Sequence, residues 1–176
     1  MTVILYIAAS LDGYIAREDG DVSWLEIYGE SGEDYGYPTF FAGIDALVMG
    51  SRTYEQIVGF GEWPYGDKPV YVVSGRRLPV PERANVTFLS GTPHDLALCM
   101  RRRNHKNVWL VGGASLAGQF LRDGLVDEII LTVIPVLLGG GIALFGRLGS
   151  EVHLALLGAE TYPAGVVQLR YAIQPG

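Results

Sequence analysis

The sequence contains few of the residues that hold metals or form disulfides. Cys99 is its only cysteine, so the chain can form neither an internal disulfide nor a cysteine-based metal cluster. Its three histidines, His94, His105 and His153, are scattered and lack the spacing of metal ligands. We therefore expect no metal site, and we expect Cys99 to be an inert buried thiol, because free cysteine packs as a small hydrophobe.

Positive charge is also scarce. The chain carries 13 lysines and arginines against 19 aspartates and glutamates, a formal net charge of -6. This balance argues against wide, nonspecific binding of nucleic acid. The one basic run, Arg101–Lys106, closes a predicted helix, where positive charge is favourable at the carbonyl end of the helix dipole. We expect that run to be a solvated helix end.

Long apolar runs are missing as well. The longest, "EIILTVIPVLL" and "DALVMG", have the length of strands and fall far short of the roughly 20 residues that cross a membrane. The first residues, "MTVILYIAASLDG", have neither the basic flank nor the cleavage pattern of a signal peptide, and they suit a first core strand better. The sequence predicts a cytoplasmic protein that does not bind membranes.

What the sequence does contain is an alternation of short apolar runs with helix-like segments, over a length that fits one domain at residues 1–176. Strands are predicted at Val3–Ala9, Ala46–Met49, Pro69–Ser74, Val86–Leu89, Val108–Val111 and Glu128–Val136, and helices at Tyr37–Gly43, Thr53–Val58, Pro93–Asn104 and Ser115–Asp123. Continuously apolar strands are typical of a parallel sheet with helices on both faces. Two strand-like runs around Thr161–Gly165 predict a terminal hairpin. We expect an α/β fold with a mostly parallel central sheet and an antiparallel last strand.

Two segments carry more local signals. The helix predicted from Pro93 has Thr92 as a possible cap and Asp95 in place to complete a capping box. Residues Glu18–Pro38, by contrast, are polar, glycine-rich and weakly periodic. A loop of that length in a compact domain is usually functional or disordered.

Three predicted strands end in turns that suit anions. The turns are Gly50-Ser51-Arg52-Thr53, Ser74-Gly75-Arg76-Arg77 and Gly112-Gly113. Glycine lets a ligand approach the backbone, N–H groups at a helix start attract anions, and arginine gives forked, charge-assisted hydrogen bonds. Each of these turns alone is weak evidence, because a tight glycine turn commonly follows the end of a strand. Together, at the carboxyl edge of one sheet, they predict a site for a ligand with several phosphates, one separate from the others, as in NADPH.

Two familiar motifs are absent. The sequence has no G-x-G-x-x-G after its first strand, which disfavours a dinucleotide-binding Rossmann domain. It also has no G-x-S-x-G nucleophile elbow, so hydrolase chemistry has little support.

Five motifs in order resemble the dihydrofolate reductase superfamily. They are "AASLDGYIA", "DALVMGSRTYE", "VYVVSGR", "VWLVGGASL" and "LTVIPVLLGGGIALF". The set is most similar to bacterial dihydrofolate-reductase-like proteins that share a fold with the C-terminal reductase domain of riboflavin biosynthesis. The resemblance implies an eight-stranded central sheet, NADPH as cofactor, hydride transfer to a small heterocycle, and a homodimer.

The same resemblance implies roles for individual residues. Ala9 and Ile15 would flank the nicotinamide; Gly50, Ser51, Arg52 and Thr53 would hold phosphates at a helix start; Ser74 and Arg76, around Gly75, would read the adenosine 2′-phosphate; and Gly112, Gly113, Ala114, Ser115 and Leu116 would wrap the pyrophosphate. Because dihydrofolate reductases join their paired glycines by a cis peptide, we predict one at Gly112–Gly113.

The substrate side is less defined. Aromatic residues near strand ends, among them Tyr14, Trp24, Phe41 and Tyr54, could line the substrate pocket or simply pack in the core. Dihydrofolate reductases keep one carboxylate on the helix before "VMG", and this sequence has Glu33 and Asp34 in about that region. Asp12 in "SLDG" is the other candidate proton donor, although Asp-Gly pairs also form turns. A water could serve instead.

Three functions therefore remain open. The first is an NADPH-dependent reductase of a pterin, folate or related pyrimidine. The second is the riboflavin-pathway reductase itself, whose ribosyl phosphate would need a basic group near the site; Arg17 is the nearby candidate. The third is an NADPH-binding module without turnover.

Overall fold

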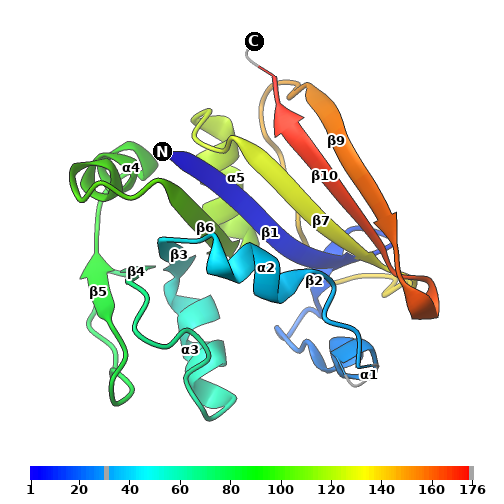
Figure 1. Cartoon of the computed structure of the whole chain (residues 1–176), viewed down its shortest axis with the longest axis horizontal. Helices are drawn as coiled ribbons and strands as arrows, with labels where there is room; N and C mark the ends of the chain where they lie inside the picture. The colour runs from blue at the N-terminus through cyan, green and yellow to red at the C-terminus, as the bar shows by residue number, and fades with distance from the viewer. Residues whose placement is uncertain (30–31, 175–176) are drawn as a thin grey trace.

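A central eight-stranded sheet organises the computed structural model of the chain, which describes residues 1–29 and 32–174 (Figure 1). Its strands are β1 (Thr2–Ser10), β3 (Ala46–Gly50), β4 (Val70–Val73), β5 (Val86–Leu89), β6 (Asn107–Gly112), β7 (Glu128–Ile134), β9 (Leu154–Thr161) and β10 (Val167–Ile173). They follow the order β5-β4-β3-β6-β1-β7-β10-β9. The strands from β5 to β7 in this order run parallel, whereas β10 is antiparallel to both of its neighbours. The expected mostly parallel sheet and terminal hairpin are confirmed.

Helices cover both faces of this sheet, as the apolar strands predicted. The helical elements are η1 (Ser23–Leu25), α1 (Glu26–Gly29), α2 (Tyr37–Ala42), α3 (Ser51–Gly59), α4 (Pro93–Arg102), α5 (Ala114–Arg122) and η2 (Pro163–Gly165). Leu96 of α4 and Phe120 of α5 pack on one face, while Phe40 of α2 and Tyr54 of α3 pack on the other. Figure 1 shows α2 in front of the sheet and α5 behind it. Within the described ranges, no helix is both long enough and apolar enough to cross a membrane.

Element boundaries differ from prediction where the local chemistry changes. β7 ends at Ile134, short of the predicted Val136, because Pro135 has no N–H to continue the ladder. α4 ends at Arg102, before the predicted Asn104, whose left-handed φ of 61° is incompatible with the helix. The sequence pattern therefore located both elements correctly but placed their C-terminal ends too far along the chain.

α4 carries two predictions with different outcomes. Its capping box is confirmed: Asp95 N donates to Thr92 Oγ1 at 3.3 Å, and Thr92 N donates to Asp95 Oδ2 at 2.9 Å. The prediction that Cys99 is buried is wrong, because this residue is only half-buried. Leu96 and Met100 form the core stripe of the helix, and Cys99 lies beside that stripe.

Two features of the loops were not predicted. β2 (Tyr14–Ala16) and β8 (Ile142–Ala143) form a separate two-stranded antiparallel sheet. Within the predicted loop Glu18–Pro38, the short turns η1 and α1 hold Trp24 in a small apolar cluster with Ile134. Residues 30 and 31 of that loop lie outside the described residues.

Candidate active site

Three parallel strands bring the predicted anion-binding turns to one edge of the sheet. β3 lies between β4 and β6, and the strand register pairs Gly50 with Val73 and Met49 with Gly112. Ser74 directly follows β4 and therefore lies beside the end of β3. A Cβ placed on Gly50 would lie only 3.9 Å from Gly112 O. This is the carboxyl edge, where ligands of open α/β sheets bind.

Two helices begin at this edge without a capping side chain. Gly50 and Gly113 are the N-cap residues of α3 and α5, and among the described residues neither helix start receives a side-chain cap bond. The first N–H groups of each helix are therefore available to an anion, which the positive end of the helix dipole also favours. Ser51, Arg52 and Thr53 form the first turn of α3, where Arg52 is exposed.

The first turn of α5 offers mainly backbone. Ala114 is half-buried and Ser115 is exposed, but Leu116 is buried in the core with α4 and the sheet. Leu116 can therefore contribute to a pyrophosphate site only through its backbone N–H.

The glycine pair leaves a cradle that side chains would fill. Gly112 has a φ of 125°, a conformation that residues with a side chain rarely adopt. A Cβ on Gly113 would lie 3.3 Å from Thr53 Oγ1, tighter than ordinary contact. The peptide between the two glycines is cis, so that prediction is confirmed. A group such as a pyrophosphate, which needs close backbone approach and N–H donors, fits this cradle.

The third turn presents a hydroxyl and a guanidinium. Ser74 Oγ donates to Arg76 O at 2.6 Å and accepts from Arg76 N at 3.1 Å, so the two residues form one closed turn around Gly75. The Arg76 guanidinium donates to Glu55 Oε1 on α3 at 2.8 Å. Both side chains are exposed, so this ion pair is weak and a phosphate could compete for the arginine.

The strand that carries Ala9, one of the two residues assigned to the nicotinamide, passes close to this cradle. Ala9 is buried near the end of β1, and Ile15 is half-buried in β2. Ile7, also on β1, lies close to the glycine pair, because a Cβ on Gly112 would be 3.6 Å from Ile7 Cδ1. The end of β1 thus borders the same site.

Asp12, one of the two predicted proton donors, is held by hydrogen bonds at the end of β1. Its carboxylate accepts hydrogen bonds from Ser10 Oγ at 2.6 Å, Leu138 N at 3.1 Å and Gly139 N at 2.8 Å. The bond from Ser10 and those from the backbone hold the pKa of Asp12 below its ordinary value. An ionised carboxylate with its oxygens already engaged ties two loops together and is poorly suited to donate a proton.

Asp34 remains available for that role. It is exposed in the turn before α2, where Asp34 Oδ1 accepts from Gly36 N at 2.8 Å and Asp34 O accepts from Tyr37 N at 2.9 Å. The next residue, Tyr35, accepts a hydrogen bond from the Tyr6 hydroxyl of β1 at its carbonyl oxygen, at 3.4 Å. The turn that carries Asp34 thus precedes α2 and contacts β1 through Tyr35.

Two of the four aromatic residues predicted to bind substrate pack against the core on the face that carries α2 and α3. Tyr54 is 1% exposed, and its hydroxyl donates to Pro79 O at 2.6 Å. Phe41 stacks on Tyr37 with centroids 5.5 Å apart and packs edge-on against Trp109. Tyr54 therefore has almost no exposed surface for a substrate, whereas Phe41 is half-buried and its role in binding substrate remains a prediction.

The other two aromatic residues lie near the ends of β1 and β7. Tyr14 is half-buried in β2. Trp24 is 7% exposed and packs with Ile134 and Val166, and its indole Nε1 has no hydrogen-bond partner among the described residues. A role for either ring in binding substrate remains a prediction.

Sequence reasoning missed a polar group on the sheet face beneath α2. Tyr6, Thr132 and Gln168 come from β1, β7 and β10, and Gln168 Nε2 donates to Thr132 Oγ1 at 3.0 Å. The Tyr6 ring stacks on Phe40 with centroids 4.2 Å apart. Burial raises the pKa of Tyr6. Hydrogen bonds with Gln168 and Thr132 act in the opposite direction and partly offset this rise. The available signal was the presence of Thr132 and Gln168 within mostly apolar strands.

The basic candidate for a substrate phosphate is already engaged. The Arg17 guanidinium pairs with Asp21 and donates to Ser23 Oγ at 3.0 Å. Nearby, Gln56 Nε2 of α3 donates to Gly20 O at 2.9 Å, which fastens the same loop to α3. Arg17 therefore serves the conformation of its own loop.

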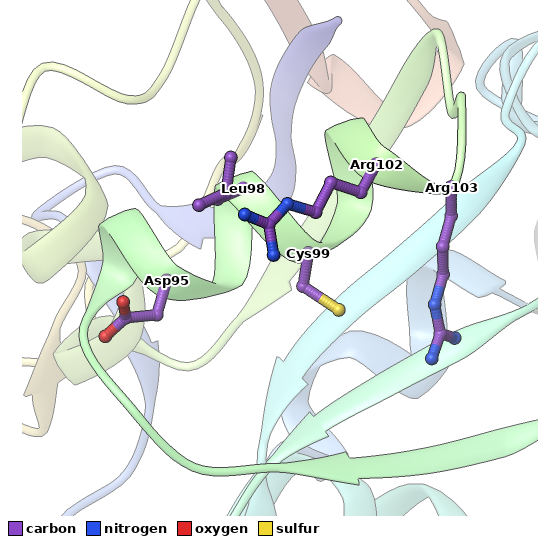
Figure 2. Close-up of a pocket in the computed structure, with 5 residues that line it drawn as sticks. All are labelled: Asp95, Leu98, Cys99, Arg102 and Arg103. Atoms are coloured by element: carbon purple, nitrogen blue, oxygen red, sulfur yellow. The ribbon is translucent and has the colours of Figure 1, made fainter.

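A surface hollow lies apart from the predicted site. It is lined by Asp95, Leu98, Cys99, Arg102 and Arg103, all from α4 and its end (Figure 2). Arg103 Nη1 donates to Tyr71 OH at 3.1 Å, so one wall is held in place. The hollow includes no residue of the carboxyl-edge turns, and we do not assign the site to it.

The sheet order, the two uncapped helix starts and the glycine pair together define an α/β protein of the dihydrofolate-reductase-like class. The family model described as the RibD C-terminal domain matches residues 1–168, so the chain belongs to this family. The uncharacterized protein YwjB of Bacillus subtilis (strain 168) is 39% identical over 169 residues, which cover 96% of this chain and 95% of YwjB.

Solved structures agree with this assignment. A protein of Shewanella sp. PV-4, whose attribution to riboflavin biosynthesis is provisional, has a TM-score of 0.90 and 32% identity, covering 99% of this chain and 100% of its own. A Thermotoga maritima diaminohydroxyphosphoribosylaminopyrimidine deaminase/5-amino-6-(5-phosphoribosylamino)uracil reductase has a TM-score of 0.73 over 98% of this chain and 56% of its own. At 15% identity the second likeness shows the fold alone.

Proposed function

We propose that the protein is an NADPH-dependent reductase that transfers hydride to a pyrimidine heterocycle of the kind reduced in riboflavin biosynthesis. The observation that carries this proposal is the meeting of two uncapped helix N-termini and a side-chain-free glycine pair at one sheet edge. Membership of the RibD C-terminal domain family supports the same chemistry.

Different residues at the carboxyl edge of the sheet hold different parts of the cofactor. NADPH, when bound, supplies the hydride. The N–H groups after Gly113 and those of the first turn of α3 bind its phosphates, and Ser74 with Arg76 binds the 2′-phosphate. Ala9 and Ile15 orient the nicotinamide and keep water away from it.

The remaining requirement is a proton for the reduced substrate. We assign it to Asp34, because its carboxylate lies in the turn over β1 and is exposed, whereas the carboxylate of Asp12 is tied to two loops. A substrate that covered Asp34 would bring the atom to be protonated within reach of its carboxyl group.

A second candidate substrate is a pterin or folate, which carries no ribosyl phosphate. The observation that favours it is the engagement of Arg17 by Asp21 and Ser23, since a phosphate on the substrate would have to break these bonds to use that cation. On this reading the cofactor site and the role of Asp34 are unchanged, and only the far end of the substrate differs.

We also propose that the protein forms a homodimer. β9 is an edge strand of the sheet, and three of its leucines, Leu154, Leu156 and Leu157, are 42%, 59% and 53% exposed. An exposed apolar edge strand is prone to pair with another chain. Size-exclusion chromatography with light scattering should give the mass of two chains; the mass of one chain would contradict the proposal.

The function is tested by binding followed by turnover. NADPH is titrated first, and oxidation of NADPH is then followed at the nicotinamide absorbance band. The substrates are 5-amino-6-(5-phosphoribosylamino)uracil, its dephosphorylated form and dihydrofolate. Oxidation with either pyrimidine supports the proposal, and oxidation with dihydrofolate alone supports the second candidate. Tight binding without oxidation would indicate a non-catalytic NADPH-binding module, and lack of binding would refute the cofactor assignment.

A further inference from the structure

Three strands contribute polar side chains to one point beneath the turn that precedes α2. Gln168 Nε2 on β10 donates to Tyr35 O at 3.2 Å and to Thr132 Oγ1 on β7 at 3.0 Å. The Tyr6 hydroxyl on β1 donates to the same Tyr35 O at 3.4 Å. These contacts join segments up to 133 residues apart in the chain. Such a connection on a sheet face fixes the turn with respect to the strands.

The turn needs support because its backbone is unusual. Tyr35 has a φ of 51°, in the left-handed region that costs energy for a residue with a side chain. Gly36, the next residue, is also left-handed, with a φ of 71°. Tyr35 adds a ring contact with Tyr162 on the β9–β10 connection, with centroids 5.2 Å apart. The surrounding contacts therefore hold a conformation that the local sequence does not favour by itself.

Asp34 is the residue directly before Tyr35, so its carboxylate moves with this turn. We propose that Gln168 is a positioning residue for Asp34, acting through Tyr35 O with help from Tyr6 and Thr132. This inference rests on the proposed function, in which Asp34 supplies the proton. Gln168 is half-buried and makes two donor contacts from a single amide. A methyl or carboxylate group in its place cannot make both.

Two variants test the role of the amide. Gln168→Met keeps the length of the side chain and removes both donors. We expect kcat to fall about tenfold to a hundredfold, the loss typical of a misplaced catalytic group, with the dissociation constant for NADPH unchanged. Gln168→Glu cannot donate when ionised but regains one donor when protonated. The ratio of its kcat to that of the wild-type protein should therefore rise as the pH falls through the pKa of the introduced carboxyl.

The matched control is Gln174→Glu, which makes the same charge change beyond the opposite end of β10, at an exposed position. Its kcat ratio should stay near unity at every pH. A purely structural role for Gln168 would lower the melting temperature of Gln168→Met without changing kcat at a temperature where the variant is folded. That outcome, or a pH-independent kcat ratio for Gln168→Glu, would overturn the proposal.

Asp34→Asn separates this inference from the proposed function. If Asp34→Asn loses activity and Gln168→Met does not, the assignment of Asp34 as proton donor is supported and the positioning role of Gln168 is refuted. If Asp34→Asn retains full activity, the assignment of the proton donor fails, and the positioning role fails with it. Tyr6→Phe provides a second approach should Gln168→Met fold poorly, because it removes one donor to Tyr35 O and retains the ring that stacks on Phe40. We expect it to lower kcat as well; an unchanged kcat in this variant would count against the network.

Discussion

A single methyl group added at Gly113 should block the cofactor without unfolding the protein. Gly113 has a φ of -79°, which alanine adopts without strain, so Gly113→Ala is compatible with the backbone. The new Cβ would lie 3.3 Å from Thr53 Oγ1, so the threonine must shift slightly. Overpacking a core typically costs about 1–3 kcal/mol of folding stability. Because the required shift is slight, we expect a cost at the low end, about 1 kcal/mol.

The expected loss of binding is larger than that loss of stability. In the proposed site, the methyl group would stand at the N-cap of α5, where a pyrophosphate would have to approach the N–H groups of the helix. Each hydrogen bond to a charged group that is lost removes about 1.5–3 kcal/mol. Loss of one such bond therefore raises the dissociation constant for NADPH about tenfold to a hundredfold, since 1.4 kcal/mol corresponds to a factor of ten.

Fluorescence titration of NADPH measures this effect, with thermal unfolding measured in parallel. Gly59→Ala is the control, because it adds the same methyl group at the far end of α3, where a Cβ would meet nothing within 4 Å. It should bind NADPH like the wild-type protein. If Gly113→Ala is folded and also binds like the wild-type protein, the glycine pair does not face the pyrophosphate and the reasoning fails.

Three further predictions concern single side chains. Arg76→Ala should weaken NADPH binding about tenfold, through loss of a charge-assisted hydrogen bond, and leave NADH binding unchanged; equal weakening of both would remove the assignment to the 2′-phosphate. Asp12→Asn should lower the melting temperature at neutral pH. Because the native pKa of Asp12 lies below its ordinary value of 3.8, its stabilising effect is present above that pH and is lost as the pH falls through the native pKa. The difference in melting temperature should thus narrow in acid, and a constant difference would contradict this role. Thr92→Ala should cost about 1 kcal/mol of stability in chemical denaturation through loss of the helix cap, with NADPH binding intact, and no loss would show that the cap is dispensable.

The arrangement of strands was predictable because it depends on local patterns. Continuous apolar runs indicated a sheet buried on both faces, and the turns after Met49, Val73 and Val111 marked where strands end. Parallel strands then place those turns at one edge whatever the details of packing. The cis peptide at Gly112–Gly113 came from the resemblance to a family and has no signature in composition or periodicity.

The substrate side was less predictable because it depends on contacts between distant segments. Tyr54 and Phe41 are aromatic residues near strand ends, and only the packing of α3 and α2 shows that their rings turn inward. In the sequence, Asp12 is an available acid. Only the folded structure shows that its carboxylate accepts hydrogen bonds from the backbone N–H groups of Leu138 and Gly139.

The network around Gln168 illustrates the same difficulty. Its members lie on three strands, and a polar residue within an apolar strand could equally face solvent. The turn that they support contains a left-handed tyrosine, which no residue preference would predict. Its function can be inferred only after the sheet has brought β1, β7 and β10 together.

The most direct measurement is a map of backbone amide shifts by NMR as NADPH is added to the protein. If the carboxyl edge seats the dinucleotide, the largest shifts will fall at residues 50–53, 74–76 and 112–116. Absence of shifts at these three turns, or shifts confined to the hollow on α4, would contradict the proposed cofactor site.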